Sequence, residues 1–147
     1  LPNRRDAKTQ RQRRVIQIMK SEEELNRLSN TVIGLTIEVH KALGPGLLES
    51  AYQQCLAWEL RREGLSVKEQ VAIPIRYKEL EIPNAYRLDM LIENDLVVEL
   101  KAVERIEPVH VAQMLTYLKV NGLRLGLLLN FNVEIMKKGI RRVVNNF

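Results

Sequence analysis

The chain has 147 residues, of which 46% are hydrophobic and 28% are charged, and this size and balance fit one globular domain with a substantial core. Its single cysteine, Cys55, excludes an internal disulfide framework and a cysteine-based zinc site, and it favours a reducing, cytoplasmic setting. No run of about 18 apolar residues occurs, so we expect neither a membrane-spanning helix nor a membrane partner.

The net charge of +5 arises from the N-terminal end of the chain. Residues 1–20 hold seven basic residues and one acidic residue, whereas the other 127 residues hold 16 basic and 17 acidic ones. We therefore expect a basic, disordered extension at 1–20 and one domain at 21–147. The extension fits a solvated arm or a non-specific phosphate-binding arm. Because Met19 directly precedes the first well-patterned segment, residues 1–18 are interpreted as an upstream extension or added sequence without a predicted function.

Two helices are predicted at the start of the domain. Apolar residues recur at steps of three and four over residues 22–43, which indicates an amphipathic helix. A Gly-Pro-Gly sequence at 44–46 ends this helix. A second helix is predicted over 47–63, with Gly64 as its C-terminal stop.

The hydrophobic period then changes to that of strands. The predicted elements are strands at 66–77, 85–92 and 96–103, a helix from Pro108 to Val120, a strand at 124–130, and one or two short edge strands at 134–144. The stretch 124–130 is apolar almost throughout, which indicates burial on both faces. This order of elements predicts an α/β fold, in which a mixed central β-sheet is flanked by helices.

Three charged residues stand inside the predicted central hairpin: Asp89, Glu99 and Lys101. Side chains alternate along a strand, so all three fall on one face, while apolar residues that include Leu88 and Met90 share the other face. A three-residue loop at 93–95 is the connection that preserves this pattern, and it places Asp89 directly across from Glu99.

Two facing carboxylates repel each other unless a cation lies between them. Carboxylate oxygens of this kind suit Mg²⁺ or Mn²⁺. The same register predicts that Arg87 lies opposite Lys101, a like-charge pair that an anion such as phosphate would relieve. From the hairpin alone, a ladder of ion pairs among these four charged residues on an exposed sheet face is an equally good interpretation.

Asp89, Glu99 and Lys101 form a D…ExK pattern that resembles the signature of the PD-(D/E)XK nuclease superfamily. Leu88 stands where the superfamily's name has Pro, a position that is loosely kept among such folds. The resemblance implies a restriction-endonuclease-like core, in which helices lie on both sides of a mixed sheet, and it implies nuclease activity.

Two further segments resemble the GxxExxY family of that superfamily. Residues 110–131 are similar to that family's QxxxYL helix and the strand that follows it, and the whole resemblance covers roughly residues 24–147. The naming positions, within residues 40–56, are occupied by Gly46, Glu49 and Tyr52.

The resemblance also implies roles for individual residues. Asp89 and Glu99 would be the metal carboxylates, joined by the main-chain carbonyl of Leu100 as a third ligand. Glu49 would complete the metal shell through water. At a helix start it could instead merely favour the helix dipole, but the Gly-Pro-Gly turn aims the start of that helix and favours the functional role. Lys101 would orient or deprotonate the attacking water and stabilise the pentavalent phosphate, a task that suits the compact lysine charge.

The helix that begins at Pro108 carries further candidates. The resemblance implies that Gln113 and Tyr117 border the site, and their spacing puts them on one helix face with His110. Tyr117 could instead be a boundary aromatic residue, and His110 a surface or capping residue. Tyr52 and Trp58 are expected to pack in the core.

The residues and the resemblance together predict an Mg²⁺- or Mn²⁺-dependent phosphodiesterase that acts on nucleic acid, with DNA as the expected substrate. The resemblance implies a 5′-phosphate on the product. The alternative is a non-catalytic module that binds nucleic acid or a protein partner on the same fold. The complete D…ExK set favours the enzyme, whereas the near-neutral domain favours weak or partner-assisted binding. The sequence leaves open DNA or RNA, single or double strand, and a homodimer.

Overall fold

The computed structural model describes residues 20–147, so the predicted basic extension lies outside the described residues apart from Lys20. The helices of the described part are α2 (Glu22–Leu43), α3 (Glu49–Arg62), α4 (Pro108–Asn121) and the 3₁₀ helix η1 (Met136–Gly139). The strands are β1 (Val67–Tyr77), β2 (Leu80–Ile92), β3 (Leu96–Lys101), β4 (Leu125–Asn130) and β5 (Ile140–Val144). Among these helices, none has the length and apolar character that a membrane crossing requires.

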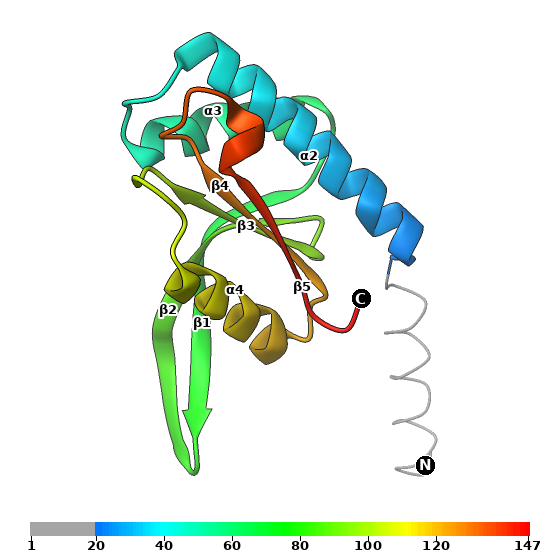
Figure 1. Ribbon diagram of the computed structural model, residues 1–147. Coiled ribbons are helices and arrows are strands. Elements are labelled where there is room, and N and C mark those ends of the chain that lie inside the picture. The colour runs from blue at the N-terminus through cyan, green and yellow to red at the C-terminus, as the bar shows by residue number, and fades with distance from the viewer. Residues whose placement is uncertain (1–19) are drawn as a thin grey trace.

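The strands form a sheet in the order β1-β2-β3-β4-β5, in which β3 and β4 run parallel and the other neighbours run antiparallel. Helices α2 and α3 cover one face of this sheet and α4 covers the other (Figure 1). The predicted mixed α/β fold is therefore confirmed. The β3–β4 connection has the length that a parallel pair requires, and α4 forms most of it.

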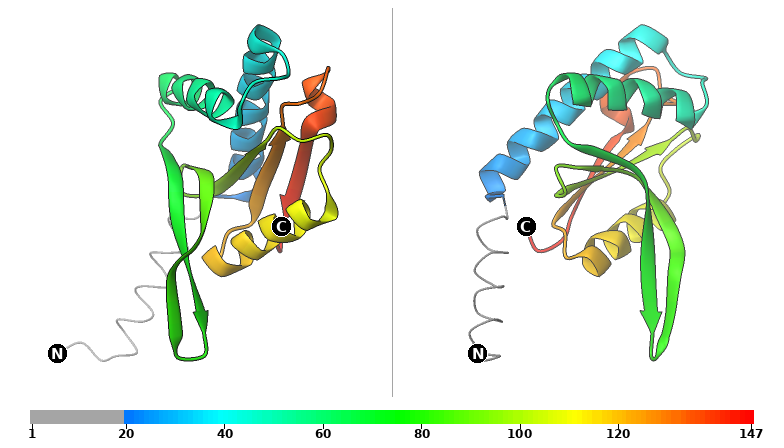
Figure 2. Two further views of the ribbon diagram at one scale, coloured as in Figure 1. Left: turned by 90° about the vertical axis from the view of Figure 1, so that its left-hand side faces the viewer. Right: turned by 180° about the vertical axis from the view of Figure 1, so that it is seen from behind.

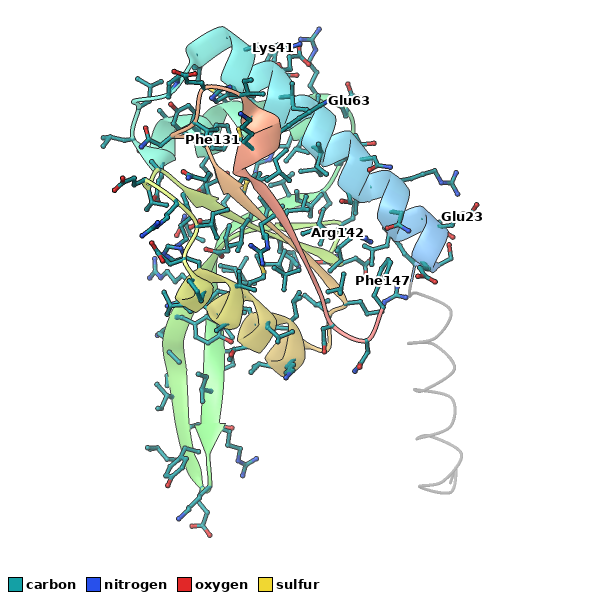
Figure 3. The ribbon with its side chains drawn as sticks, in the orientation of Figure 1. Glu23, Lys41, Glu63, Phe131, Arg142 and Phe147 are labelled. Atoms are coloured by element: carbon teal, nitrogen blue, oxygen red, sulfur yellow. The ribbon has the colours of Figure 1, made fainter. Side chains whose placement is uncertain are left out.

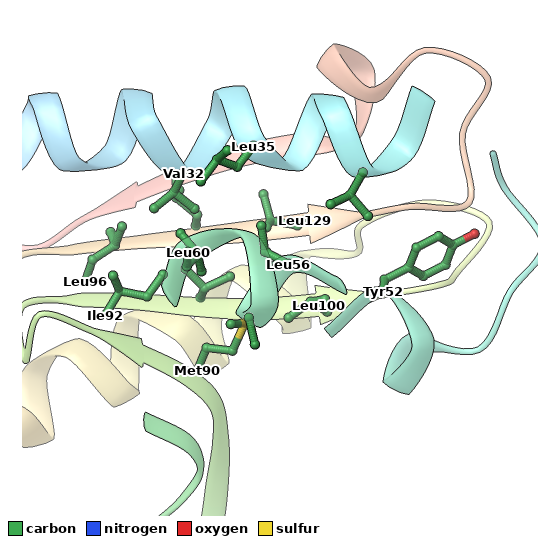
Figure 4. Close-up of a cluster of buried hydrophobic side chains, with 14 of the residues drawn as sticks. Val32, Leu35, Tyr52, Leu56, Leu60, Met90, Ile92, Leu96, Leu100 and Leu129 are labelled. Carbon is green, nitrogen blue, oxygen red and sulfur yellow. The ribbon is translucent and has the colours of Figure 1, made fainter. Parts of the chain in front are cut away.

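Two apolar clusters fill the spaces between these layers. The first, which we call the α2–α3 core, includes Val32, Leu35, Tyr52, Leu56, Leu60, Met90, Ile92, Leu96, Leu100 and Leu129 (Figure 4). The second, which we call the α4 core, consists of Ile73, Leu88, Val97, Met114, Leu118, Leu128 and Val143. Strand β4 lies between the two clusters and is buried along its whole length, as its apolar sequence predicted.

The turn between α2 and α3 sets the direction in which α3 starts. Helix α2 ends at Gly44, whose φ of +68° lies in the left-handed region that glycine adopts without a steric cost. The Tyr52 hydroxyl donates a hydrogen bond to the Gly44 carbonyl at 2.6 Å and accepts one from the Leu47 N–H at 3.1 Å. Its ring stacks on Phe131 with the ring centroids 4.2 Å apart, so the packing role predicted for Tyr52 is confirmed.

Trp58 does not pack in the core as predicted. It is 58% exposed, and the Arg62 guanidinium lies 5.1 Å from the centroid of its ring. The reason is its position on α3, because it falls on the side opposite to the inward-facing residues Tyr52, Gln53, Leu56, Ala57 and Leu60.

The C-terminal segment consists of η1 and the edge strand β5, in agreement with the predicted edge. Arg142 of β5 donates a hydrogen bond to the Asn26 side chain of α2. The same guanidinium lies 4.8 Å from the ring centroid of Phe147 (Figure 3). The first contact links the last strand to the first described helix, and the second holds the C-terminal residue against that strand.

Strand β2 is longer than predicted, because it begins at Leu80 and continues through Pro83 and Asn84. It pairs with β1 along most of its length, and the two strands project from the body as a two-stranded arm (Figure 2). An arm of two strands leaves both outer edges without a neighbouring strand, and proline is tolerated at such an edge because its missing N–H removes no ladder bond. Pro83 therefore lies within the strand, which was predicted to begin only at residue 85.

Strand β2 also changes direction at Asp89. Leu88 and Met90 were predicted to share one core face, but Leu88 packs in the α4 core and Met90 in the α2–α3 core. Across from Asp89 on β1 lies Gln70, whose φ of +51° is a left-handed backbone conformation inside a strand. This kink turns the arm away from the sheet, so side-chain alternation does not continue through it.

Candidate active site

Asp89 and Glu99 lie where β2 separates from β3. The β2–β3 register pairs Met90 with Val98, and Asp89 and Glu99 are the next two positions, as the predicted three-residue loop requires. The Asp89 N–H donates a hydrogen bond to Glu99 Oε1 at 2.9 Å, and the Leu100 N–H donates one to Asp89 Oδ2 at 2.9 Å. Each carboxylate is thus held by the main chain of the other's strand.

The electrostatics of this pair favour a bound cation. Burial, followed by the negative charge of Asp89, raises the pKa of Glu99 to about 8, and the positive charge of Lys101 opposes this shift. Two oxygen ligands that lack a paired cation suit a hard divalent ion such as Mg²⁺. Within residues 20–147, however, no three His, Cys, Asp or Glu side chains group closely enough to hold a metal alone. A cation at this pair would need main-chain oxygens and water as its other ligands.

The ladder of ion pairs that the sequence left open does not form. The ion pairs found among residues 20–147 are Arg61–Glu69 and Arg105–Glu107. Arg87 does not lie opposite Lys101, because the β2–β3 pairing ends before it, and it pairs with Ala72 of β1 instead. Lys101 is half-buried and lies near enough to Glu99 to influence its pKa. Its ammonium group makes no ion pair in the described part of the chain, so its charge acts on Glu99 from beyond ion-pair distance.

Glu49 joins the same region from α3. It is the first residue of that helix, and its Oε1 accepts a hydrogen bond from the Ala102 N–H at 3.2 Å, at the end of β3. Glu49 and Asp89 also line one hollow of about 580 Å³ at this end of the sheet. The other polar side chains that line it are Ser50, Gln53 and Gln70. Glu49 and Asp89 thus share this hollow, whereas Glu99 is buried and does not line it.

Helix α4 brings Tyr117 to the carboxylates from the other side. Its ring stacks on that of Tyr86 in β2, with the ring centroids 4.2 Å apart. Burial, followed by the negative charge of Glu99, raises the pKa of Tyr117, which indicates that its hydroxyl lies near the site. Gln113 is exposed one helical turn earlier, and its side chain makes no hydrogen bond to any described residue.

His110 caps α4, the alternative that the sequence had left open. Its Nδ1 accepts a hydrogen bond from the Glu107 N–H at 2.9 Å, and the Glu107 side chain accepts one from the His110 main chain. This reciprocal arrangement is a capping box, which satisfies main-chain donors that the helix start would leave unpaired.

Three polar residues around the site escaped the sequence analysis: Gln53, Gln70 and Asn130. The buried Asn130 ends the apolar strand β4, and its side chain accepts from the Val103 N–H at 3.1 Å and donates to the Val103 carbonyl at 2.9 Å. It therefore holds the chain that follows Lys101. The available signals were weak: a polar residue at the end of an apolar run, and a glutamine on the inward side of α3, four residues after Glu49.

Comparison with known protein families matches residues 26–143 to the PD-(D/E)XK nuclease superfamily. The match spans both carboxylates of the pair, the lysine beside them and the helices on both faces of the sheet. No curated protein and no solved structure shows significant similarity to the chain. The family match extends over most of the chain, and the fold agrees with it. The chain belongs to the PD-(D/E)XK nuclease superfamily.

Proposed function

We propose that the protein is a metal-dependent nuclease that hydrolyses phosphodiester bonds of nucleic acid, with DNA as its substrate. Membership of the nuclease superfamily supports this activity. The observation that carries the proposal is that each of the Asp89 and Glu99 carboxylates accepts a main-chain N–H from the other's strand, which holds the two together, with Asp89 at an open hollow. We also propose that the chain is a member of the GxxExxY family. Gly46, Glu49 and Tyr52 match its naming positions, and the hydrogen bond from the Ala102 N–H to Glu49 near Asp89 supports this assignment.

The cofactor of this proposal is Mg²⁺ or Mn²⁺. Asp89, Glu99 and the main-chain carbonyl of Leu100 would hold it directly, and Glu49 would reach it through water. Oxygen ligands of this kind match the preference of both ions. When bound, such an ion stabilises charge on phosphoryl oxygens and makes its bound water more acidic.

The side chains around the carboxylates supply the rest of the chemistry. Lys101 follows Glu99 by two residues on β3 and is near enough to influence its pKa. As an ammonium it would orient the attacking water and stabilise a phosphate oxygen as negative charge develops there, and as a neutral amine it would take the proton of that water. Tyr117 and Gln113 share a face of α4 and would contact the substrate next to the scissile phosphate. The buried position of Glu99 strengthens the interactions that its own carboxylate makes, because the local dielectric constant is low.

A cleavage assay tests the proposal. The full chain should cleave plasmid DNA with Mg²⁺ or Mn²⁺ but not with EDTA, and the products should carry 5′-phosphates. Lys101→Ala should lose this activity, whereas Lys41→Ala, which changes an exposed lysine in the last turn of α2, should keep it. Single-stranded DNA and RNA substrates in the same assay identify the preferred nucleic acid.

Two results would contradict the proposal. Cleavage by Lys101→Ala at the wild-type rate would remove the lysine from the reaction. Failure to cleave any nucleic acid with either ion would favour the alternative, a module that uses the same fold to bind nucleic acid or a protein partner.

A further inference from the structure

Gln70 occupies an unusual backbone conformation directly beside the proposed metal site. Its φ of +51° lies in the left-handed region, which side chains other than glycine, asparagine and aspartate seldom adopt. It lies between the paired residues Glu69–Met90 and Val71–Leu88, and therefore across from Asp89. Because such conformations persist only where the surrounding structure enforces them, this position invites a functional explanation.

The side chain of Gln70 is engaged on the site side. Its Nε2 donates a hydrogen bond to Gln53 Oε1 at 3.0 Å and lies 3.5 Å from Asp89 Oδ1, at the outer limit of hydrogen-bond length. Gln53 in turn donates from its Nε2 to the Asp89 carbonyl at 3.3 Å and to Glu69 Oε1 at 3.2 Å. Two amides, one on α3 and one on β1, thus hold both the main chain and the carboxylate of Asp89.

The two oxygens of the Asp89 carboxylate have different surroundings. Oδ2 accepts the Leu100 N–H, whereas Oδ1 lies beside the Gln70 amide. Asp89 and Gln70 both line the hollow that Glu49 also lines. An amide at this distance can donate to Oδ1 without carrying a charge that would compete with a cation. The arrangement therefore fixes the rotation of the carboxylate and keeps one oxygen at the hollow.

We infer that Gln70 is a positioning residue of the metal site, which together with Gln53 aligns the Asp89 carboxylate for cation binding. This inference rests on the proposed function. The left-handed backbone at Gln70 directs its amide back to Asp89, and the same kink turns the arm away from β3. Residues that orient metal ligands in this way typically alter metal affinity about 10–100-fold when they are replaced.

Gln70→Gly separates positioning from stability. Glycine adopts a positive φ without strain, so the thermal midpoint of the full chain should be unchanged or raised. The affinity of the Gln70→Gly variant for Mn²⁺ should fall about tenfold or more. Electron paramagnetic resonance measures this affinity through the signal of the unbound ion. Gln70→Asn should behave similarly, because asparagine tolerates the backbone but its amide is too short to reach both partners.

Asn94→Gly is the matched control. Asn94 has a φ of +56° in the β2–β3 turn, and its side chain makes no hydrogen bond to any described residue, so Mn²⁺ affinity should stay at the wild-type value. If the wild type binds Mn²⁺ and both Gln70 variants bind it equally well, the inference is wrong while the proposed function stands. If the wild type binds no Mn²⁺ at millimolar concentration, the proposed metal site fails and this inference fails with it.

Discussion

Glu99 is a carboxylic acid in the most buried strand pair of the sheet, and its charge state links the site to the stability of the whole domain. In the folded protein, burial and then the charge of Asp89 raise its pKa from 4.5 to about 8. Between these two pH values the folded chain keeps a proton that the unfolded chain releases. The stability of the metal-free protein should therefore fall as pH rises from about 4.5 to about 8, and level off above that.

Chemical denaturation in EDTA between pH 5 and 9 measures this effect. At about 1.4 kcal/mol for each pKa unit, the loss should amount to a few kcal/mol. Glu99→Gln cannot titrate and should remove this part of the pH dependence. A wild type whose pH profile matched that of Glu99→Gln would show that Glu99 is ionised in the folded state throughout this range.

Two charge-removing substitutions should change metal-free stability in opposite directions. Asp89→Asn keeps an oxygen that can accept the Leu100 N–H but removes the negative charge that helps to raise the pKa of Glu99, so stability should stay level or rise by about 1 kcal/mol. Lys101→Ala removes the cation that opposes the raised pKa of Glu99, so stability should fall by about 1 kcal/mol. Thermal melting in EDTA measures the direction of both stability changes. A loss of stability in both variants would contradict an unfavourable interaction between the Asp89 and Glu99 carboxyl groups.

At the scale of elements, two glycines should respond oppositely to the same substitution. A Cβ at Gly139 would lie 2.1 Å from the main-chain oxygen of Asn130, at the end of β4. Gly139→Ala should therefore destabilise the protein by about 1–3 kcal/mol, because η1 must shift away from β4. Gly34→Ala is the control, since a Cβ in the middle of α2 meets no atom within 4 Å and should stabilise the helix by about 0.5–1 kcal/mol.

Urea unfolding of the two alanine variants gives both free-energy changes. Because Asn130 also holds Val103, a shift of η1 should disturb the chain just after Lys101, and Gly139→Ala should lose Mg²⁺-dependent cleavage more than stability alone explains. Equal stabilities for the two variants would mean that the close approach of η1 to β4 is absent in solution.

The elements that the sequence predicted best were those with uninterrupted patterns. The three- and four-residue period of α2 and the apolar run of β4 gave their bounds almost to the residue. Strand β2 was predicted too short, at 85–92, because a free sheet edge, where Pro83 is tolerated, cannot be recognised from local sequence. The kink at Gln70 was missed for a related reason, since glutamine carries no signal for a left-handed backbone.

In the candidate site, too, the features with a clear sequence pattern were predicted and those without one were missed. The register of β2 and β3 was predictable from hydrophobic alternation and loop length, and it brought Asp89 to Glu99. The amides of Gln53 and Gln70 were not predictable, because they meet through tertiary packing of α3 against the start of the arm. Residues that carry charge in an apolar strand are visible in a sequence, whereas neutral residues that orient them are not.

At the scale of the whole molecule, the site lies where the sheet divides. Strand β2 leaves β3 at Asp89 to form the arm, and α3 begins beside the end of β3 (Figure 1 and Figure 2). Helix α4 covers the opposite face and brings Tyr117. The division of the sheet exposes main-chain groups that Asp89 and Glu99 satisfy, and it opens the hollow in which a substrate phosphate would lie.

The central claim is that Asp89 and Glu99 together hold a divalent cation. Crystals of the full chain soaked in millimolar Mn²⁺ and measured near the manganese absorption edge test it most directly. We predict an anomalous peak between the two carboxylates, within about 2.3 Å of an oxygen from each, and no peak in Asp89→Asn crystals treated in the same way. A wild-type map without a peak at this position, or a peak that persists in Asp89→Asn, would contradict the account.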